Sequence, residues 1–336
     1  MSTSTSIPSK MRAVQIMKQG GLDVLEDREA DVPKPGPNDI LIKVNKAGVN
    51  FIDTYQRSGL YKIEKFPYTL GQEAAGKVVA VGESQKGKGL EVGDRAITYF
   101  GGSFAEYVSV PRARITKVPD AVNDTDAVAS CVQGLTAWTL VRETYSVKKG
   151  DWVLVHAAAG GVGLLLCQMA KHLGAHVIGT TSSEEKAEEA KKNGAEHMIN
   201  YAKENTVERV LEITNGQGVQ AIFDGVGKDT WEDDFKMIAR KGTIATFGNA
   251  SGAVEPFAPL KLAGKNVKVA RPTLVNYVYT QEEFETTYAE LFDLIAKGIV
   301  KFKIHGEYNL SAQGIRQAQE DITSRKTSGK LIVNVA

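Results

Sequence analysis

Cysteine is the residue that this sequence uses least. Cys131 and Cys167 are the only two in 336 residues, which is too few for a disulfide framework and too few for a structural zinc site built from four cysteines. We therefore expect a protein of a reducing compartment, the cytoplasm, whose fold depends on its apolar core. Cys167 falls in an apolar helical run and is interpreted as a core residue.

Long apolar runs and a strong net charge are also missing. The most apolar stretches are short and interrupted, as at residues 152–159, and none approaches the roughly 18–20 residues that a membrane helix needs. With 41 basic and 40 acidic side chains, the net charge of +1 gives no electrostatic reason to expect nucleic acid. The first ten residues are rich in Ser and Thr. They predict a disordered tail, with a weak mitochondrial presequence as the open alternative.

Residues 12–115 show the pattern of short β-strands. Turn-forming residues, including the Pro33–Pro37 cluster and the pair Gly101–Gly102, separate runs that are rich in Val and Ile. This spacing is typical of an all-β, barrel-like domain. The predicted strands lie at 12–17, 40–49, 74–81 and 95–98.

The pattern changes near residue 123, where a helix is predicted over 127–142 and strands then alternate with helices. Such alternation predicts right-handed βαβ crossovers and a parallel sheet. The predicted strands lie at 152–156, 176–180, 197–200, 218–224 and 242–247, and the predicted helices at 163–172, 184–193, 207–214 and 230–238.

After Arg271–Pro272 the pattern is mixed, with an amphipathic helix at 281–297 and a closing strand at 330–335. The simplest architecture is α/β in class. It has a β-rich domain at 1–125, an inserted doubly wound parallel-sheet domain at 126–271, and a return to the first domain at 272–336.

The segment WVLVHAAAGGVGLLLCQMAKHLG at 152–174 carries the clearest functional signal. A buried strand leads into a glycine-rich turn and then into an apolar helix. Against a G-x-G-x-x-G template, Ala158 takes the first position, and Gly160 and Gly163 take the second and third. Small residues let the backbone approach a pyrophosphate, and the helix N-terminus offers free N–H groups to it. Because the turn lies inside a βαβ unit, it predicts a dinucleotide site rather than an ordinary tight turn.

The end of the next strand indicates which dinucleotide binds. NAD sites usually place an acidic residue there for the ribose hydroxyl, whereas this chain has the hydroxyl-rich tip Thr180–Ser183, followed by Lys186. Hydroxyls with a nearby ammonium suit the 2′-phosphate of NADPH. Glu184 and Glu185 complicate this assignment, unless they complement the helix start. Lys186 has a second interpretation as a solvated surface residue.

Six segments together are similar to the zeta-crystallin-like quinone oxidoreductase branch of the medium-chain dehydrogenase/reductase superfamily. The resemblance runs from about Arg12 to Val335. Its segments are AGVNFIDTYQRSGLY at 47–61, GQEAAGKVVAVG at 71–82, AAAGGVG at 157–163, DGVGKDTW at 224–231, FGNASG at 247–252 and RKTSGK at 325–330.

This resemblance implies a GroES-like catalytic domain and a Rossmann domain, with NADPH in the cleft between them, and a homodimer. It implies a quinone substrate, with Asn50, Tyr55 and Tyr61 near the nicotinamide. The cofactor residues that it implies, together with those of the glycine turn and the strand ends, are Gln133, Thr136, Ala159, Gly160, Gly161, Val162, Gly163, Thr181, Ser182, Lys186, Tyr201, Phe247, Gly248, Asn249, Arg271 and Arg325.

The resemblance also predicts an enzyme that works without zinc. Zinc-dependent relatives carry a G-H-E motif, where this chain has Gly71–Gln72–Glu73, and the other ligand loop reads Gly48–Val49–Asn50 with no Cys. Without a Lewis acid, alcohol oxidation is disfavoured and reduction by NADPH is favoured. His156, at the end of the strand before the glycine turn, is interpreted as structural.

The tyrosines have two interpretations of equal weight. Tyr55 or Tyr61 donates a hydrogen bond or proton to a developing oxyanion, or both are walls that stack on a flat substrate. Two other functions stay open. One is the reduction of α,β-unsaturated ketones or aldehydes, which shares fold and cofactor. The other is AU-rich RNA binding sensitive to NADPH, against which the near-neutral charge argues.

Overall fold

The computed structural model describes residues 7–324 and 326–336. The chain forms two compact units. Unit 1 comprises Met1–Val132, Val278–Ala296 and Ile304–Ala336, and unit 2 comprises Gln133–Tyr277 and Lys297–Lys303. The sequence placed the inserted domain at 126–271 and assigned 272–336 to the first domain, whereas unit 2 begins at Gln133, extends to Tyr277 and also contains the segment Lys297–Lys303.

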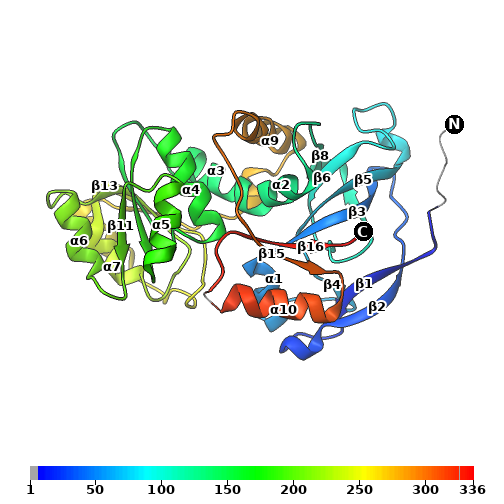
Figure 1. Ribbon diagram of the computed structural model, residues 1–336, viewed down its shortest axis with the longest axis horizontal. Helices are drawn as coiled ribbons and strands as arrows, with labels where there is room; N and C mark the ends of the chain where they lie inside the picture. The colour runs from blue at the N-terminus through cyan, green and yellow to red at the C-terminus, as the bar shows by residue number, and fades with distance from the viewer. Residues whose placement is uncertain (1–6, 325) are drawn as a thin grey trace. The chain divides into compact units, whose positions relative to one another are not determined.

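Unit 1 is built on a seven-stranded sheet in the order β15-β16-β3-β5-β6-β8, with β7 also paired to β3 (Figure 1). β15 and β16 are parallel, and the other ladders are antiparallel. A smaller sheet has the order β2-β1-β4. The strands are β1 (Lys10–Ile16), β2 (Glu26–Asp31), β3 (Asp39–Val49), β4 (Tyr68–Thr69), β5 (Glu73–Val81), β6 (Arg95–Tyr99), β7 (Tyr107–Pro111), β8 (Ile115–Lys117), β15 (Ile304–Asn309) and β16 (Lys330–Asn334).

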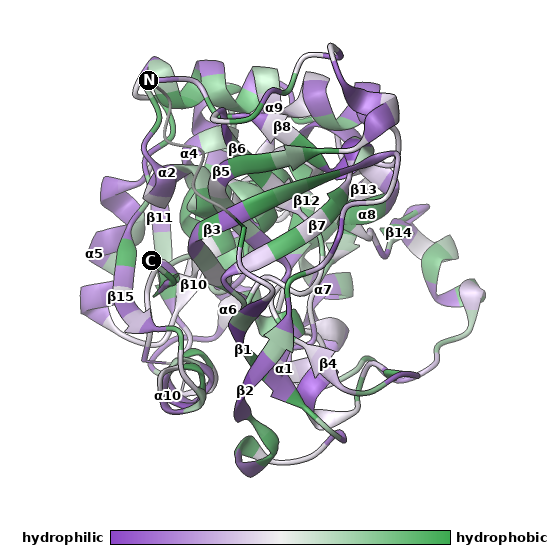
Figure 2. Cartoon of the chain, turned by 90° about the vertical axis from the view of Figure 1, so that its right-hand side faces the viewer, coloured by the Kyte–Doolittle hydropathy of each residue, from purple (hydrophilic) through white to green (hydrophobic). Residues whose placement is uncertain are grey.

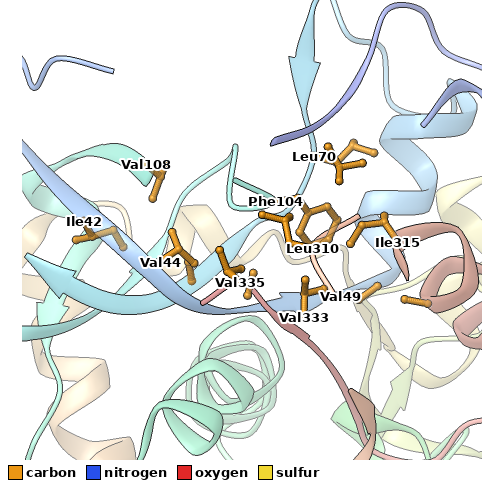
Figure 3. Packing of buried hydrophobic residues seen from close by; sticks show 14 of the residues in the cluster. Ile42, Val44, Val49, Leu70, Phe104, Val108, Leu310, Ile315, Val333 and Val335 are labelled. Atoms are coloured by element: carbon orange, nitrogen blue, oxygen red, sulfur yellow. The ribbon is translucent and has the colours of Figure 1, made fainter. Parts of the chain in front are cut away.

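The core of unit 1 forms where the branched side chains of β3 and β16 meet a helix. Figure 3 shows Val49 and Val333 beside Phe104 and Ile315 in this cluster. Figure 2 shows β3 mostly hydrophobic and β2 mostly hydrophilic. β2 forms an edge of its sheet and consists largely of charged residues. Charged side chains on an edge strand discourage pairing with another chain. The helices of unit 1 are α1 (Phe51–Ser58), α2 (Asp124–Ala129), α9 (Gln281–Ala296) and α10 (Ala312–Thr323).

Unit 2 contains a six-stranded, fully parallel sheet in the order β11-β10-β9-β12-β13-β14. Counted from β9, this order is 3-2-1-4-5-6, the Rossmann arrangement. The βα alternation expected from the sequence is therefore confirmed. The strands are β9 (Trp152–Val155), β10 (His176–Thr181), β11 (His197–Asn200), β12 (Val219–Asp224), β13 (Ile238–Thr246) and β14 (Lys268–Ala270).

Helices pack on this parallel sheet, as the alternation requires. α4 and α5 contact β10 and each other, whereas α6 contacts α7, which packs on β13 (Figure 1). No helix within the described residues is long and apolar enough to cross a membrane. The α-helices of unit 2 are α3 (Thr136–Thr139), α4 (Gly161–His172), α5 (Glu184–Lys192), α6 (Thr206–Ile213), α7 (Trp231–Met237) and α8 (Leu274–Tyr277).

The helix predicted over 127–142 is not a regular α-helix. Between α2 and α3 the chain is π-helical at Ser130–Leu135, and it is π-helical again at Leu140–Thr144. Within the first π segment, the N–H of Val132 donates to the Glu73 carboxylate at 2.5 Å. The Val132 N–H therefore bonds to a carboxylate 59 positions earlier in the sequence. π-Helical turns are frequent at functional sites.

Two predicted boundaries are wrong because long-range pairing extends the strands. Lys10 belongs to β1 and pairs with Asp31, so the disordered tail predicted for the first ten residues does not extend to Lys10. Residues 1–6 lie outside the residues that the structure describes. β13 begins at Ile238 rather than at residue 242, because Ile238 pairs with Val219 of β12.

Gly163 determines how closely α4 approaches the turn before it. A Cβ atom at residue 163 would lie 2.8 Å from both the Cα and the carbonyl carbon of Ala158. Backbone atoms cannot turn aside as a flexible side chain can. The absence of a side chain at Gly163 therefore allows the close packing that the third glycine of a dinucleotide-binding turn provides.

We predict that Gly163→Ala lowers the free energy of unfolding of unit 2 by about 1–3 kcal/mol, the usual cost of overpacking. The matched control is Gly264→Ala in the same unit, where an added Cβ meets no atom within 4 Å. Trp138, Trp152 and Trp231, the three tryptophans of the chain, all belong to unit 2. Urea unfolding followed by tryptophan fluorescence therefore measures this unit. Equal stability of the two variants would contradict the packing role.

Candidate functional site

The parallel strands of unit 2 end at one edge of the sheet. Gly179 of β10 pairs with Val155 of β9, and Thr181 with Asn200 of β11, so these strands end together. Asp224 of β12 likewise pairs with Thr246 of β13. Ligands of open α/β sheets bind at this edge. The segments predicted to bind the cofactor follow these strand ends: 157–163, Thr181–Ser182, Tyr201 and Phe247–Asn249.

The segment 157–163, called the phosphate loop below, can receive an anion. Gly160 is the N-cap of α4, and among the described residues no side-chain hydrogen bond caps this helix. Its first N–H groups therefore remain for an anion, which the positive end of the helix dipole also favours. The Gln133 side chain lies where a Cβ of Gly161 would stand. The structure thus brings two predicted cofactor residues together.

The end of β10 suits a phosphate on the adenosine ribose. Ser182 is exposed, whereas Thr181 is 3% exposed and its hydroxyl donates to the Ser183 carbonyl at 3.2 Å, so Thr181 shapes the turn. Lys186 is half-buried, and burial lowers the pKa of its ammonium. Tyr201 is exposed after β11. A role for each of these residues in binding stays a prediction.

In the sequence, Glu184 complicated the assignment of a 2′-phosphate site to the tip of β10. In the structure, its negative charge is paired with a neighbouring ammonium group. Its carboxylate accepts from the Lys203 ammonium at 3.1 Å and from the Asn200 amide at 3.2 Å. Those hydrogen bonds, from Asn200 and then Lys203, lower the pKa of Glu184. The carboxylate is therefore ionised and paired, and the tip of β10 is less acidic than the sequence implied.

Arg271 orders the loop after β13. Its Nη1 donates to the carbonyls of Thr246 at 2.7 Å and Gly248 at 3.1 Å. With its amide turned so that the oxygen faces the guanidinium, Asn249 accepts from Nη2 at 2.9 Å. The contact of Arg271 with a cofactor phosphate stays a prediction, and Arg325 lies outside the residues that the structure describes.

In unit 1 a buried ion pair holds the amide of Asn50 at both ends. The Lys330 ammonium donates to Asn50 Oδ1 at 2.9 Å, and Asn50 Nδ2 donates to Glu73 Oε1 at 2.8 Å. Lys330 also donates to Glu73 Oε1. Lys330 is 1% exposed and Glu73 is fully buried. The orientation of the Asn50 amide is therefore determined, and among the described residues Nδ2 donates one hydrogen bond, to Glu73.

Two neighbours support this cluster. Gly48 leaves space for it, because a Cβ there would lie 2.7 Å from the Glu73 Cδ and 2.8 Å from the Lys330 Cε. Asp53, on the first turn of α1, accepts from the Asn50 N–H at 2.7 Å. Burial raises the pKa of Asp53 to about 7, against the opposing effect of that hydrogen bond. Asn50 is thus held through its backbone as well as its side chain.

Tyr55 and Tyr61 lie against each other, with ring centroids 5.4 Å apart and planes inclined at 62°. Tyr61, Leu60 and Phe66 are among the exposed large apolar residues. Exposed aromatic and aliphatic surface of this kind suits a flat aromatic ligand. Proton donation by one of these tyrosines stays a prediction.

The loops that carry zinc ligands in zinc-dependent relatives hold amides here. Gln72 Nε2 donates to Gln56 Oε1 at 3.1 Å, and Asn50 is engaged by the ion pair. Side-chain amides are not the Cys, His or carboxylate ligands that zinc takes. Within residues 7–324 and 326–336, no group of three or more His, Cys, Asp or Glu could hold a metal ion.

The main residues that sequence reasoning missed are Glu73 and Lys330, which stood only inside family-like segments. Their importance depends on burial and on a contact across 257 positions of the chain. Fully buried Lys and Glu residues are rare, so their burial identifies Glu73 and Lys330 as unusual. Burial can be seen only in a structure.

Comparison with known proteins extends this description to the whole chain. Residues 36–120 match the family described as alcohol dehydrogenase GroES-like domain, and residues 161–296 match zinc-binding dehydrogenase. A probable quinone oxidoreductase of Schizosaccharomyces pombe is 43% identical over 95% of this chain and 96% of its own. A 2-haloacrylate reductase of a Burkholderia species is 34% identical over 96% of this chain and 98% of its own.

The same agreement holds in three dimensions. The crystal structure of Escherichia coli quinone oxidoreductase complexed with NADPH matches with a TM-score of 0.92 and 39% identity, over 96% of this chain and all of that one. The predicted fold class, a GroES-like domain with a Rossmann domain, is confirmed. The chain belongs to the quinone oxidoreductase family of the medium-chain dehydrogenase/reductase superfamily.

Proposed function

We propose that this chain is an NADPH-dependent quinone reductase that works without zinc. The observation that carries the proposal is Asn50, a neutral hydrogen-bond donor held by a buried ion pair in unit 1. A fixed neutral donor can stabilise charge that develops on a carbonyl oxygen without a metal ion. The relatives named quinone oxidoreductase support the same substrate class.

The residues of unit 2 fit NADPH as the cofactor. The phosphate loop would receive the pyrophosphate at the start of α4, and Ser182 with Lys186 would receive the 2′-phosphate. When bound, NADPH supplies the hydride equivalent, while the protein supplies orientation and electrostatics. A solved relative bound to NADPH supports this assignment.

The residues of unit 1 would act on the substrate. Asn50 donates its remaining Nδ2 hydrogen to a carbonyl oxygen of the quinone and stabilises its negative charge. Tyr61 and Tyr55 stack on the ring or donate the proton that completes the hydroquinone. A quinone is already a good electron acceptor, so a neutral donor suffices where an alcohol dehydrogenase would use a Lewis acid.

Reduction of an activated carbon–carbon double bond is the second candidate. The 34% identity to a 2-haloacrylate reductase favours it. That reaction needs a proton delivered to carbon, and the pair Tyr55 and Tyr61, five and eleven positions after Asn50 in the sequence, offers two phenol hydroxyls for it. Substrate preference separates the two reactions.

We also propose a cytoplasmic homodimer. β14 forms one edge of the sheet of unit 2, and an edge strand offers unpaired N–H and C=O groups to a second copy. Leu260, in the segment before β14, is 82% exposed. Cys131 and Cys167 are buried and unpaired, which suits a reducing compartment. Light scattering of protein from the cytosolic fraction should give twice the chain mass; a monomer mass would contradict the dimer.

The activity is tested by following NADPH oxidation with 9,10-phenanthrenequinone, 1,4-benzoquinone and a simple enone. We expect quinone turnover that prefers NADPH to NADH by at least about tenfold, because a 2′-phosphate contact worth 1.4 kcal/mol has that effect. EDTA should leave the rate unchanged. Turnover of the enone alone would move the function to double-bond reduction, and loss of activity in EDTA would contradict the zinc-free mechanism.

The role of the ion pair is tested with a charge-compensated variant. Lys330→Met leaves Glu73 buried without a counter-charge and should lower the free energy of unfolding by about 3–5 kcal/mol. The double variant Glu73→Gln/Lys330→Met removes both charges and should recover most of this loss. We predict that its kcat with a quinone nevertheless stays at least about tenfold reduced, because the Asn50 amide is no longer held.

Far-UV circular dichroism measures the stability of these variants, and steady-state kinetics measures kcat. Asn38→Asp, at an exposed position of the same unit, is the control for an added or removed charge. A stable double variant with full activity would show that the pair supports only the fold.

A further inference from the structure

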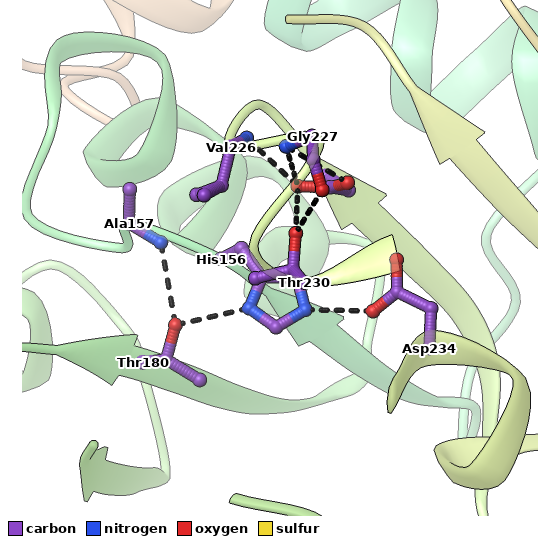
Figure 4. Close-up of polar contacts among 8 residues, drawn as sticks. His156, Ala157, Thr180, Val226, Gly227, Thr230 and Asp234 are labelled. Carbon is purple, nitrogen blue, oxygen red and sulfur yellow. Dashed lines mark hydrogen bonds and ion pairs between the residues drawn. The ribbon is translucent and has the colours of Figure 1, made fainter. Parts of the chain in front are cut away.

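A second buried polar network lies in unit 2, beside the phosphate loop. Figure 4 shows the imidazole of His156 between Thr180 and Asp234. Nε2 lies 2.8 Å from Asp234 Oδ1, and Nδ1 lies 3.2 Å from Thr180 Oγ1. Exposure is 4% for His156, 2% for Thr180 and zero for Asp234. The proposed reaction uses none of these side chains directly, so their burial needs another explanation.

Thr180 connects this network to the phosphate loop. Its hydroxyl oxygen accepts from the Ala157 N–H at 3.3 Å, and its carbonyl accepts from the Ala158 N–H at 3.0 Å. The first two residues of the loop are therefore attached to one residue of β10. Thr180 in turn is oriented by the imidazole, and the imidazole by Asp234.

Ala157 needs this support, because its φ of +50° lies in the left-handed region. A residue with a Cβ rarely adopts that conformation unless its surroundings impose it. The turn at Ala157 also places its carbonyl to accept from the Gly160 N–H at 2.8 Å, directly before α4. The conformation of Ala157 thus determines where the helix N-terminus lies.

The contacts of Asp234 indicate that its carboxylate serves to orient the His156 imidazole. Its Oδ1 contacts His156, and within the described chain its Oδ2 has no hydrogen-bond partner. The neighbouring acid Asp224 is satisfied separately, by the N–H groups of Val226 and Gly227 and by the Thr230 hydroxyl. Burial opposes a charged imidazole, but the Asp234 carboxylate raises the pKa of His156. A carboxylate that orients a histidine in this way recurs in metal sites and catalytic triads.

We propose that Asp234 and His156 are positioning residues that hold the phosphate loop, through Thr180, in the conformation that binds the cofactor pyrophosphate. This inference rests on the proposed function, which assigns the pyrophosphate to that loop. It predicts a defect confined to ligands that carry a pyrophosphate. Contacts with the 2′-phosphate end, at Ser182 and Lys186, should be unaffected.

The test compares two ligands in three variants. Thr180→Val and Asp234→Leu each break one link of the network, and Thr180→Ser keeps the hydroxyl. We expect NADPH to bind about tenfold more weakly to Thr180→Val and to Asp234→Leu, the size of one lost hydrogen bond. Thr180→Ser should restore wild-type affinity. Adenosine 2′-monophosphate, which lacks the pyrophosphate, should bind all variants within about twofold of wild type.

Isothermal titration calorimetry measures both affinities, and tryptophan fluorescence confirms that unit 2 is folded. If Asp234→Leu fails to fold, Thr180→Val, which replaces a hydroxyl by a methyl group, carries the same comparison. Normal NADPH affinity in Thr180→Val, or parallel losses for both ligands, would overturn this inference alone. A wild-type chain that binds no NADPH would overturn the proposed function, and this inference with it.

Discussion

The buried contact between Glu73 and Lys330 is the interaction on which unit 1 depends. It joins the first residue of β5 to the first residue of β16, and it also holds the end of β3 through Asn50 and the π-helical segment through Val132. Burying two charges costs more than burying an apolar pair of similar size, unless every polar atom finds a partner. Here each carboxylate oxygen accepts a hydrogen bond. The desolvation cost is therefore offset only when β5, β16, the end of β3 and the π-helical segment take this one arrangement. A shift in the register of β16 would move Lys330 away from Glu73 and lose these hydrogen bonds.

Unit 2 uses the same physical device on a different backbone. The Asp234 carboxylate is buried, and its imidazole partner contacts the neutral Thr180 hydroxyl, which accepts from the N–H of Ala157 in the phosphate loop. In unit 1 the ion pair likewise orients a neutral amide. Groups held before a ligand arrives need no reorganisation when charge develops or binds, which is the basis of electrostatic preorganisation. In unit 1 buried charge thus supports a neutral amide that the proposed reaction uses, and in unit 2 it supports a neutral hydroxyl that holds the phosphate loop.

The sequence predicted what depends on neighbouring residues. The βα alternation and the glycine turn are local patterns, so the parallel sheet could be expected from residues 152–247 and the glycine turn before α4 from residues 152–174. The networks could not, because His156 and Asp234 are 78 positions apart and Glu73 and Lys330 are 257 apart. The regular helix expected at 127–142 was wrong for the same reason. A distant carboxylate, absent from any local window, binds the N–H of Val132.

The tip of β10 shows why composition alone does not decide the coenzyme. The sequence places two glutamates and one lysine after the strand, which argues weakly against a phosphate. In the structure, the Lys203 ammonium pairs with the carboxylate of Glu184 and the Asn200 amide donates a hydrogen bond to it. Asn200 ends β11, and Lys203 lies in the turn that follows. Paired charges act over short distances, because their fields cancel and salt screens the remainder. The half-buried Lys186 and the exposed Ser182 share this tip with Glu185; burial lowers the pKa of Lys186, and the Glu185 carboxylate opposes that shift. The preference for a phosphorylated ribose therefore depends on which charges are paired rather than on how many are present.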